Sequence, residues 1–124
     1  MKVLLSIKPE FVKKIFSGEK KYEYRRMIFK QKDIESIVIY CTQPIGKVVG
    51  EITFDEILNQ EIDELWEKTK FNSGLSYSYY KEYFRDKDKG YAIKIDKLIP
   101  YNEPISLAEF DQSLHPPQSF CYLK

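Results

Sequence analysis

The segment from Gly18 to Arg26 constrains the fold of this chain most, because it combines strand-forming tyrosines with several charges. It reads Gly-Glu-Lys-Lys-Tyr-Glu-Tyr-Arg-Arg and directly follows a stretch with helical periodicity. Successive side chains of a strand point to opposite faces, so Tyr22 and Tyr24 can face a core while Glu23 and Arg25 share the other face. This pattern predicts a site for an anion or a polar ring on a rigid strand.

Size and composition favour a small globular protein. A chain of 124 residues, 43% apolar and 31% charged, can form one domain with one core, over residues 1–124. No apolar run approaches the roughly 20 residues that span a bilayer, and the N-terminal apolar stretch already ends at Lys8. Cys41 and Cys121 form neither a metal-binding spacing nor a disulfide framework. We therefore expect a cytoplasmic protein without membrane contact, cofactor or metal, and its oligomeric state stays open.

The charges are distributed unevenly along the chain. Residues 1–32 carry ten basic and three acidic side chains, a net charge of +7, whereas the rest of the chain carries −6. Such an asymmetry indicates a basic face and an anionic partner. Ordinary solvated lysines on an amphipathic helix are the alternative explanation.

Hydrophobic periodicity and turn residues predict strands and helices in the order β-α-β-β-β-α-α-β. The expected strands are 3–7, 21–26, 36–41, a long bent strand over 47–58, and 91–95. The expected helices are 9–16, with Gly18 as its C-terminal stop, 61–70, and one capped by Ser76 through about 85. After Pro100 we expect irregular chain, a helical turn at 106–110 and an extended tail over 116–122.

This order predicts an α+β fold with about five or six strands and helices inserted between them. Several connections are too short for a doubly wound parallel sheet. We expect a small mixed sheet that forms a compact, partly closed barrel decorated by helices.

The pattern Gly18-x-Lys20-x-x-Glu23-x-Arg25 resembles the signature of the ASCH domain, a branch of the PUA-like superfamily. It also lies just after the first helix, as in that family. Two further segments, 6–9 and 116–120, look like blocks of a bacterial and phage subgroup. The resemblance covers nearly the whole chain, and it implies a small β-barrel with a charged cleft and an RNA-related role.

The side chains of the motif suit an anionic, nucleotide-like ligand. Arg25 and Arg26 offer planar, permanently charged forks for phosphates or base edges. Lys8 and Lys20 add point charges, and Glu23 can orient an arginine or accept hydrogen bonds from the amino group of a base. A simple Glu23–Arg25 pair on a strand face, with ordinary surface lysines, is the alternative.

The C-terminal tail provides a second group of candidates. Two prolines stiffen the backbone before Gln118, whose amide offers both a donor and an acceptor. The tail can equally serve as a latch that Phe120 and Tyr122 hold on the barrel. Thr42, at the exit of the apolar strand, could line the same cleft. The candidate ligand-binding residues are Lys8, Lys20, Glu23, Arg25, Arg26, Thr42, Gln118 and Ser119.

An enzyme is the rival to a pure binding module, as a small amidohydrolase on a nucleoside-type substrate or as a nuclease. Some relatives with this fold are amidohydrolases of acylated cytidine that use a lysine, a threonine and a distant glutamate. Lys20 matches the lysine, but Glu23 occupies the position of the threonine, so the hydroxyl is missing. Glu64 and Glu67 are candidates for the distant glutamate. If the chain is an enzyme, Lys20 and Glu23 are the candidate catalytic residues.

A regulatory protein-interaction module is the third possibility, with exposed tyrosines as its contact surface. Tyr79 and Tyr83 lie four residues apart and can share an exposed stripe, whereas Tyr80 and Phe84 have the spacing of core residues. Trp66 lies on an apolar stripe and is expected in the core. The leading hypothesis remains a module that binds RNA, a nucleotide or a modified nucleobase in a basic cleft.

Overall fold

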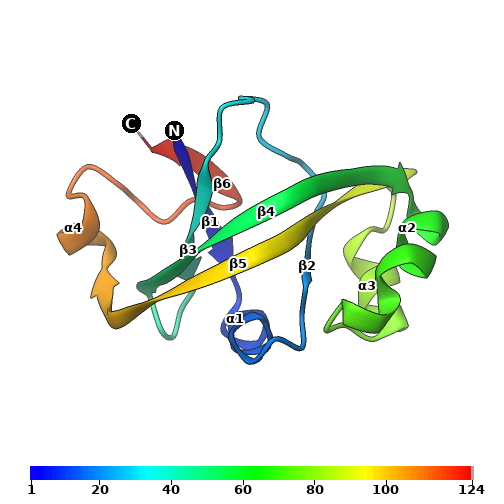
Figure 1. Ribbon diagram of the computed structural model, residues 1–124, viewed down its shortest axis with the longest axis horizontal. Coiled ribbons are helices and arrows are strands. Elements are labelled where there is room, and N and C mark those ends of the chain that lie inside the picture. Colours follow the sequence, from blue (N-terminus) through cyan, green and yellow to red (C-terminus); the bar gives the residue numbers. More distant parts are fainter. Residues whose placement is uncertain (124) are drawn as a thin grey trace.

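The computed structural model describes residues 1–123, which form one mixed sheet with helices around it (Figure 1). The elements in chain order are β1 (Lys2–Ile7), α1 (Pro9–Ser17), β2 (Tyr22–Arg25), β3 (Ser36–Cys41), β4 (Lys47–Glu61), α2 (Ile62–Thr69), the short 3₁₀ helix η1 (Lys70–Asn72), α3 (Tyr77–Tyr83), β5 (Lys89–Ser106), α4 (Leu107–Phe110) and β6 (Phe120–Leu123). The predicted α+β class with a mixed sheet is confirmed.

The sheet has the strand order β2-β5-β4-β3-β1-β6. β1 and β3 run parallel, whereas the other neighbouring strands run antiparallel. The long antiparallel β4–β5 strand pair crosses the whole molecule, with α2 and α3 at one end and α4 at the other (Figure 1). The strand pair therefore carries the two distant helical groups on one continuous support.

The sheet curls like a barrel, but its two edge strands are not joined by a backbone ladder within the described residues. Instead, the Arg25 side chain on edge strand β2 reaches Ser6 of β1 and Ser119, which precedes edge strand β6. The expected partly closed barrel thus has a seam that an arginine bridges. This seam is where the cavity described below opens.

The core is built from β-branched and aromatic side chains on both faces of the sheet. Val3, Leu5 and Ile39 belong to a cluster that the helix α1 covers. A second cluster, between the sheet and the α2–α3 pair, contains Tyr80 and Phe84, which confirms their predicted packing role. Burial of these apolar side chains is the main favourable contribution to folding.

The largest difference from the sequence-based prediction lies in β5. We expected a short strand over 91–95 followed by irregular chain, but β5 continues through Pro100 and Pro104 to Ser106. β2 pairs with β5 only from Tyr91 to Lys94, so the later half of β5 has β4 as its one strand neighbour. Proline lacks a backbone donor and is tolerated in a strand with one free side.

The bend of β4 also has a local cause. Gly50 pairs with Pro100 next to a register shift, and a Cβ at residue 50 would lie 2.7 Å from the Ile99 carbonyl oxygen. Only glycine permits this approach of the two backbones. β4 runs three residues beyond the predicted end, to Glu61.

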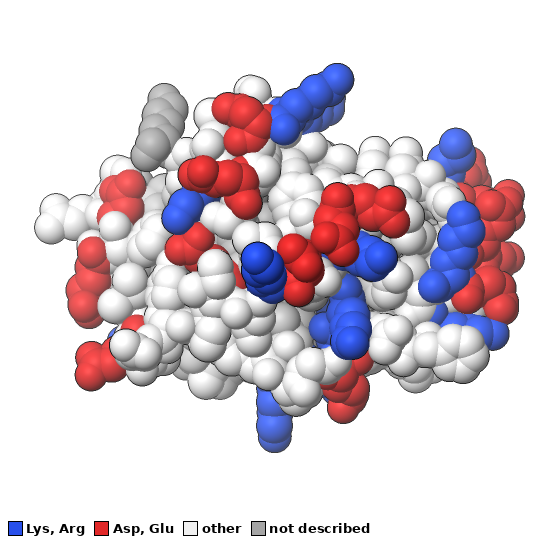
Figure 2. Space-filling model, viewed as in Figure 1, with Lys and Arg blue, Asp and Glu red and all other residues white. Residues whose placement is uncertain are grey.

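The surface charges on the face drawn in Figure 2 are mixed. Blue and red side chains alternate across this face, so it does not form a continuous basic field. In addition, none of the helices within residues 1–123 combines the length and apolar character needed to cross a bilayer.

Candidate functional site

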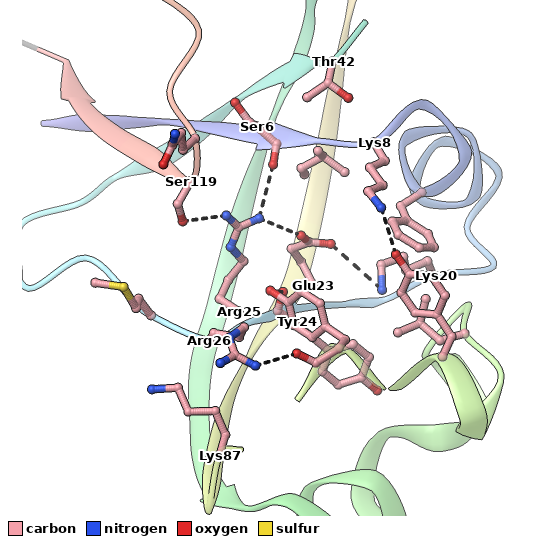
Figure 3. Close-up of a pocket in the computed structure, with 17 residues that line it drawn as sticks. Ser6, Lys8, Lys20, Glu23, Tyr24, Arg25, Arg26, Thr42, Lys87 and Ser119 are labelled. Carbon is pink, nitrogen blue, oxygen red and sulfur yellow. Dashed lines mark hydrogen bonds and ion pairs between the residues drawn. The ribbon is translucent and has the colours of Figure 1, made fainter. Parts of the chain in front are cut away.

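A cavity of about 630 Å³ opens beside the barrel seam (Figure 3). Its walls come from the end of β1, the first turn of α1, β2, the exit of β3, helix α3 and the segment 116–119, which we call the strap. Elements from both ends of the chain therefore meet around one hollow. Its volume falls within the range of small-molecule sites.

Three charged side chains from the predicted motif form the floor of the cavity. Lys20, Glu23 and Arg25 expose only 2%, 5% and 8% of their surface. The two carboxylate oxygens of Glu23 are divided between the cations: Oε1 lies 3.9 Å from Lys20 Nζ and Oε2 lies 3.2 Å from Arg25 Nη1. The expected Glu23–Arg25 pair exists, but it is buried at a cavity rather than exposed on a strand face.

The ammonium group of Lys20 is surrounded by two aromatic rings and a backbone carbonyl oxygen. Its Nζ donates a 2.7 Å hydrogen bond to the Ser73 carbonyl, and it lies 4.8 Å from the centre of the Tyr24 ring and 5.5 Å from that of Phe11. Burial lowers the pKa of Lys20 below its ordinary value of 10.5, although the nearby Glu23 acts in the opposite direction. Lys20 therefore gives up its proton more readily than a surface lysine.

The connection between α2 and α3 packs closely against the Lys20 side chain. Gly74 has a φ of +69°, and a Cβ there would lie 2.9 Å from Lys20 Cβ. Lys14 Nζ donates to the Gly74 carbonyl at 2.8 Å, and the backbone of Lys21 donates to Asn72. These contacts fix the Lys20 side chain from behind, so its head points to the cavity side of β2 (Figure 3).

Arg25 connects three parts of the site. Its Nη1 donates to the Ser6 carbonyl at 3.2 Å as well as to Glu23, and its Nη2 donates to Ser119 Oγ at 2.7 Å (Figure 3). A guanidinium is suited to this task because its donors are held in one plane. Much of the donor capacity that we assigned to a ligand is thus used within the protein.

The strap is anchored on both sides of Gln118. Ser6 Oγ donates to the Pro117 carbonyl at 2.6 Å, and the Ser6 backbone donates to the Ser119 carbonyl at 3.0 Å. The strap does act as part of a C-terminal latch, because Phe120 packs against the main core cluster. The latch and the cavity wall are therefore the same segment.

One wall of the cavity is aromatic. Phe11 and Tyr79 form an edge-to-face pair with ring centres 5.3 Å apart, and Tyr83 lies nearby on the same helix. The Tyr83 hydroxyl donates to the Tyr24 carbonyl at 3.0 Å, and burial raises the pKa of Tyr83. Burial also raises the pKa of Tyr24 to about 12. Both phenols are therefore neutral near pH 7.

Cations surround the mouth of the cavity. Lys8 Nζ donates to the Tyr79 hydroxyl at 3.2 Å, and Lys87 is exposed beside the opening. Arg26 Nη1 donates to the carbonyl oxygens of Tyr83 and Arg85, both at 2.8 Å, at the C-terminal end of α3. Lysine and arginine at such a site attract anions while the aromatic wall receives a flat ring.

The structure brings all the predicted site residues to this one cavity. They are Lys8, Lys20, Glu23, Arg25, Arg26, Thr42, Gln118 and Ser119. In contrast, Glu64 and Glu67, the candidates for a distant catalytic glutamate, are not among its lining residues. Within residues 1–123, no group of three or more His, Cys, Asp and Glu side chains is arranged to hold a metal ion.

Sequence reasoning missed several residues that line the cavity around helix α3. The cavity lining includes Phe11, Met27, Leu75 and Lys87, and none of them was a candidate site residue. The four-residue spacing of Tyr79 and Tyr83 did predict a shared stripe, but both rings are half-buried in the cavity wall rather than exposed. Nothing in the sequence showed that this stripe faces the charged motif of β2, because the two segments are more than fifty residues apart.

Comparisons with known proteins identify the family of this fold. The family model of the ASCH domain matches residues 5–99. An ASCH domain-containing ribonuclease from Zymomonas mobilis subsp. mobilis is 32% identical over 98% of this chain and 83% of its own length. The crystal structure of ASCH from Zymomonas mobilis superposes with a TM-score of 0.90, at 32% identity, over 99% of this chain and 87% of that one.

A third relative shows a similar segment within a longer protein. The large ribosomal subunit protein uL22 of Ureaplasma parvum is 28% identical over 98% of this chain, which spans only 39% of that protein.

Proposed function

The chain belongs to the ASCH domain family, and from this premise we propose that its cavity binds single-stranded RNA through one unpaired nucleotide and cleaves it. One observation carries the proposal: a buried lysine–glutamate–arginine floor, an aromatic wall and a cationic mouth meet in one open cavity. Together these groups can stack on a planar ring, bind a phosphate and transfer a proton at the same place.

The shape of the cavity favours an unpaired nucleotide. A base inside a double helix is stacked and paired, so a cavity can receive it only after it has been extruded. An unpaired base can enter directly and stack on Tyr79 or Phe11, while the scissile phosphate lies between the Lys20–Glu23 floor and the cations Lys8, Arg26 and Lys87 at the mouth. The ligand would therefore be a single strand, a loop or a chain end.

RNA contains its own nucleophile, the 2′-hydroxyl. The protein therefore has only to transfer protons and to stabilise the negative charge that develops. The 2′-oxygen attacks the neighbouring phosphorus, and the bond from phosphorus to the 5′-oxygen breaks. In our proposal, Glu23 accepts the proton of the 2′-hydroxyl and the Lys20 ammonium gives a proton to the leaving oxygen. The cations at the mouth stabilise the negative charge that develops on the phosphoryl oxygens.

The pair of Lys20 and Glu23 suits these roles because the two groups differ in kind. An ionised carboxylate only accepts hydrogen bonds, whereas an ammonium only donates them. Burial makes Lys20 a stronger acid than a free lysine, which favours proton donation near neutral pH. The name of the 32% identical relative supports a ribonuclease. Position 23 carries a carboxylate and no hydroxyl, so the nucleophile of the related amidohydrolases is missing there.

The test is a cleavage assay with a labelled single-stranded RNA that contains all four bases. Lys20→Met and Glu23→Gln should each lower the cleavage rate by about 10²–10⁴-fold, the usual contribution of a general acid or base. Affinity for a non-cleavable analogue should fall much less. Lys13→Met is the matched control, since Lys13 is exposed on α1 outside the cavity.

Thermal unfolding of each variant checks that the fold is kept. Cleavage at the wild-type rate by both variants would refute the assigned chemistry. If the wild-type protein binds RNA but never cleaves it, the nuclease is excluded and a binding module remains. If it neither binds nor cleaves RNA, the whole proposal is wrong.

A further inference from the structure

We propose that the RNA strand crosses the cavity in one fixed direction, and that Lys8 and Lys87 bind the phosphates on either side of the one that is cleaved. The ligand is then an interior segment of a single strand, with its 5′ part beside Arg26 and Lys87 and its 3′ part beside Lys8. This inference rests on the proposed function, because it concerns the ligand of the same cavity.

The cations at the mouth of the cavity form two separate groups. Lys8 lies at one end, where its Nζ donates to the Tyr79 hydroxyl in the first half of α3. Arg26 lies at the other end, because its Nη1 donates to two carbonyl oxygens at the C-terminal end of α3. Lys87 lines the opening on the Arg26 side, and Glu23 lies between the two groups (Figure 3).

The two groups that transfer protons are arranged along the same line. Lys20 belongs to the Lys8 end, because its Nζ lies 5.5 Å from the centre of the Phe11 ring on α1, the helix that Lys8 precedes. Glu23 Oε1 faces Lys20, whereas its Oε2 faces Arg25 on the opposite side (Figure 3). A line from Glu23 to Lys20 therefore points toward the Lys8 end of the mouth.

The proposed chemistry converts this line into a strand direction. The 2′-hydroxyl belongs to the nucleotide on the 5′ side of the scissile phosphate, and the leaving 5′-oxygen belongs to the nucleotide on its 3′ side. Because Glu23 takes a proton from the first and Lys20 gives one to the second, the strand runs 5′ to 3′ from Glu23 to Lys20. The next phosphate on the 5′ side thus lies toward Lys87, and the next on the 3′ side lies toward Lys8.

Both lysines have hydrogen-bond donors left for a phosphate. An ammonium has three donors, and exposed Lys8 uses one of them on Tyr79. Lys87 is exposed as well, and its ammonium makes no hydrogen bond or ion pair within residues 1–123. Each lysine can therefore neutralise a phosphate of the strand without giving up an ion pair of the protein.

The experiment compares three 2′-fluoro adenosine dinucleotides, which lack the attacking hydroxyl and carry a 5′-terminal phosphate, a 3′-terminal phosphate or neither. Their affinities are measured at low salt by competition with a labelled single-stranded RNA. Wild-type protein should gain about threefold to fivefold from each terminal phosphate, as expected for one partly exposed ion pair. Lys87→Met should abolish the 5′ gain and keep the 3′ gain, and Lys8→Met should do the reverse.

Lys13→Met is the matched control, since Lys13 is exposed on α1 outside the cavity, and it should keep both gains. Loss of the 5′ gain in Lys8→Met, or equal losses of both gains in the two cavity variants, overturns the inference. A wild-type protein that binds long single-stranded RNA but gains nothing from either phosphate also overturns it. Failure of the wild-type protein to bind long RNA and every dinucleotide would instead refute the proposed function.

Discussion

Lys20 is the side chain of the site whose chemical properties the fold changes most clearly. It lies directly before edge strand β2, yet it is almost fully buried and touches a carbonyl, two aromatic rings and a carboxylate. Removal of an ammonium from water favours its neutral form, and each neighbouring carboxylate opposes this effect. The resulting lowered pKa is a property of the folded chain that the motif alone does not reveal.

This pKa predicts how cleavage depends on pH. A general acid works only when it is protonated, so the rate should fall as the pH rises through the lowered pKa of Lys20, below 10.5. Lys20→Arg stays protonated over the whole range, and its decline should move to higher pH or disappear. The measurement is the single-turnover cleavage rate against pH at constant ionic strength. The same decline in both proteins would show that another group is the acid.

At the level of elements, the sequence predicted the first three strands and all the longer helices close to their observed positions. Ser36–Cys41 was predicted with its bounds, because a β-branched run between turn residues has little alternative. The predicted strand for β5 was too short because prolines normally end a strand. Beyond Lys94, β5 pairs only with β4, and prolines are tolerated because its other edge needs no backbone donor. The position of α3 opposite β2 was not predicted either. Tertiary packing decides which side of a helix faces a distant strand, and the local sequence does not show it.

Glu51 illustrates how one side chain joins several strands. From β4, its Oε1 accepts hydrogen bonds from Lys2 on β1 at 3.0 Å and from Ser36 on β3 at 2.8 Å. Its Oε2 accepts one from Tyr101 on β5 at 2.8 Å. Burial alone would raise the pKa of Glu51, but these hydrogen bonds outweigh it and lower the pKa below 4.5.

Because the pKa of Glu51 is lower in the folded than in the unfolded chain, its contribution is present above pH 4.5 and is lost as the pH falls through the folded value. Glu51→Gln should lower the free energy of unfolding by about 2 kcal/mol at pH 7. It should also flatten the loss of stability on acidification. Urea unfolding at several pH values measures both effects.

Glu56→Gln is the control for this prediction, since Glu56 is exposed on the same strand and makes no ion pair within the described residues. A loss of stability in Glu51→Gln that is equal at pH 7 and at pH 3 would contradict the role of its charge. So would an equal effect in the control variant.

On the scale of the whole molecule, the uneven charge of the sequence becomes a local feature of the fold. The net charge of +7 on residues 1–32 does not produce a basic field on the face in Figure 2. It does supply Lys8, Lys20, Arg25 and Arg26, four of the five cations around the cavity. The fifth, Lys87, comes from the more acidic part of the chain, and composition gave no indication of it.

The affinity for single-stranded RNA in a pair of charge-matched double variants tests most directly whether RNA binds at this cavity. Lys8→Glu with Lys87→Glu changes two cations at the mouth, and Lys13→Glu with Lys97→Glu changes two exposed lysines elsewhere. We predict that the first pair weakens binding at least tenfold and reduces the salt slope of log K by about 1.4, whereas the second has little effect. An equal loss of affinity in the two double variants would contradict the account, because RNA would then bind to the overall charge and not to the cavity.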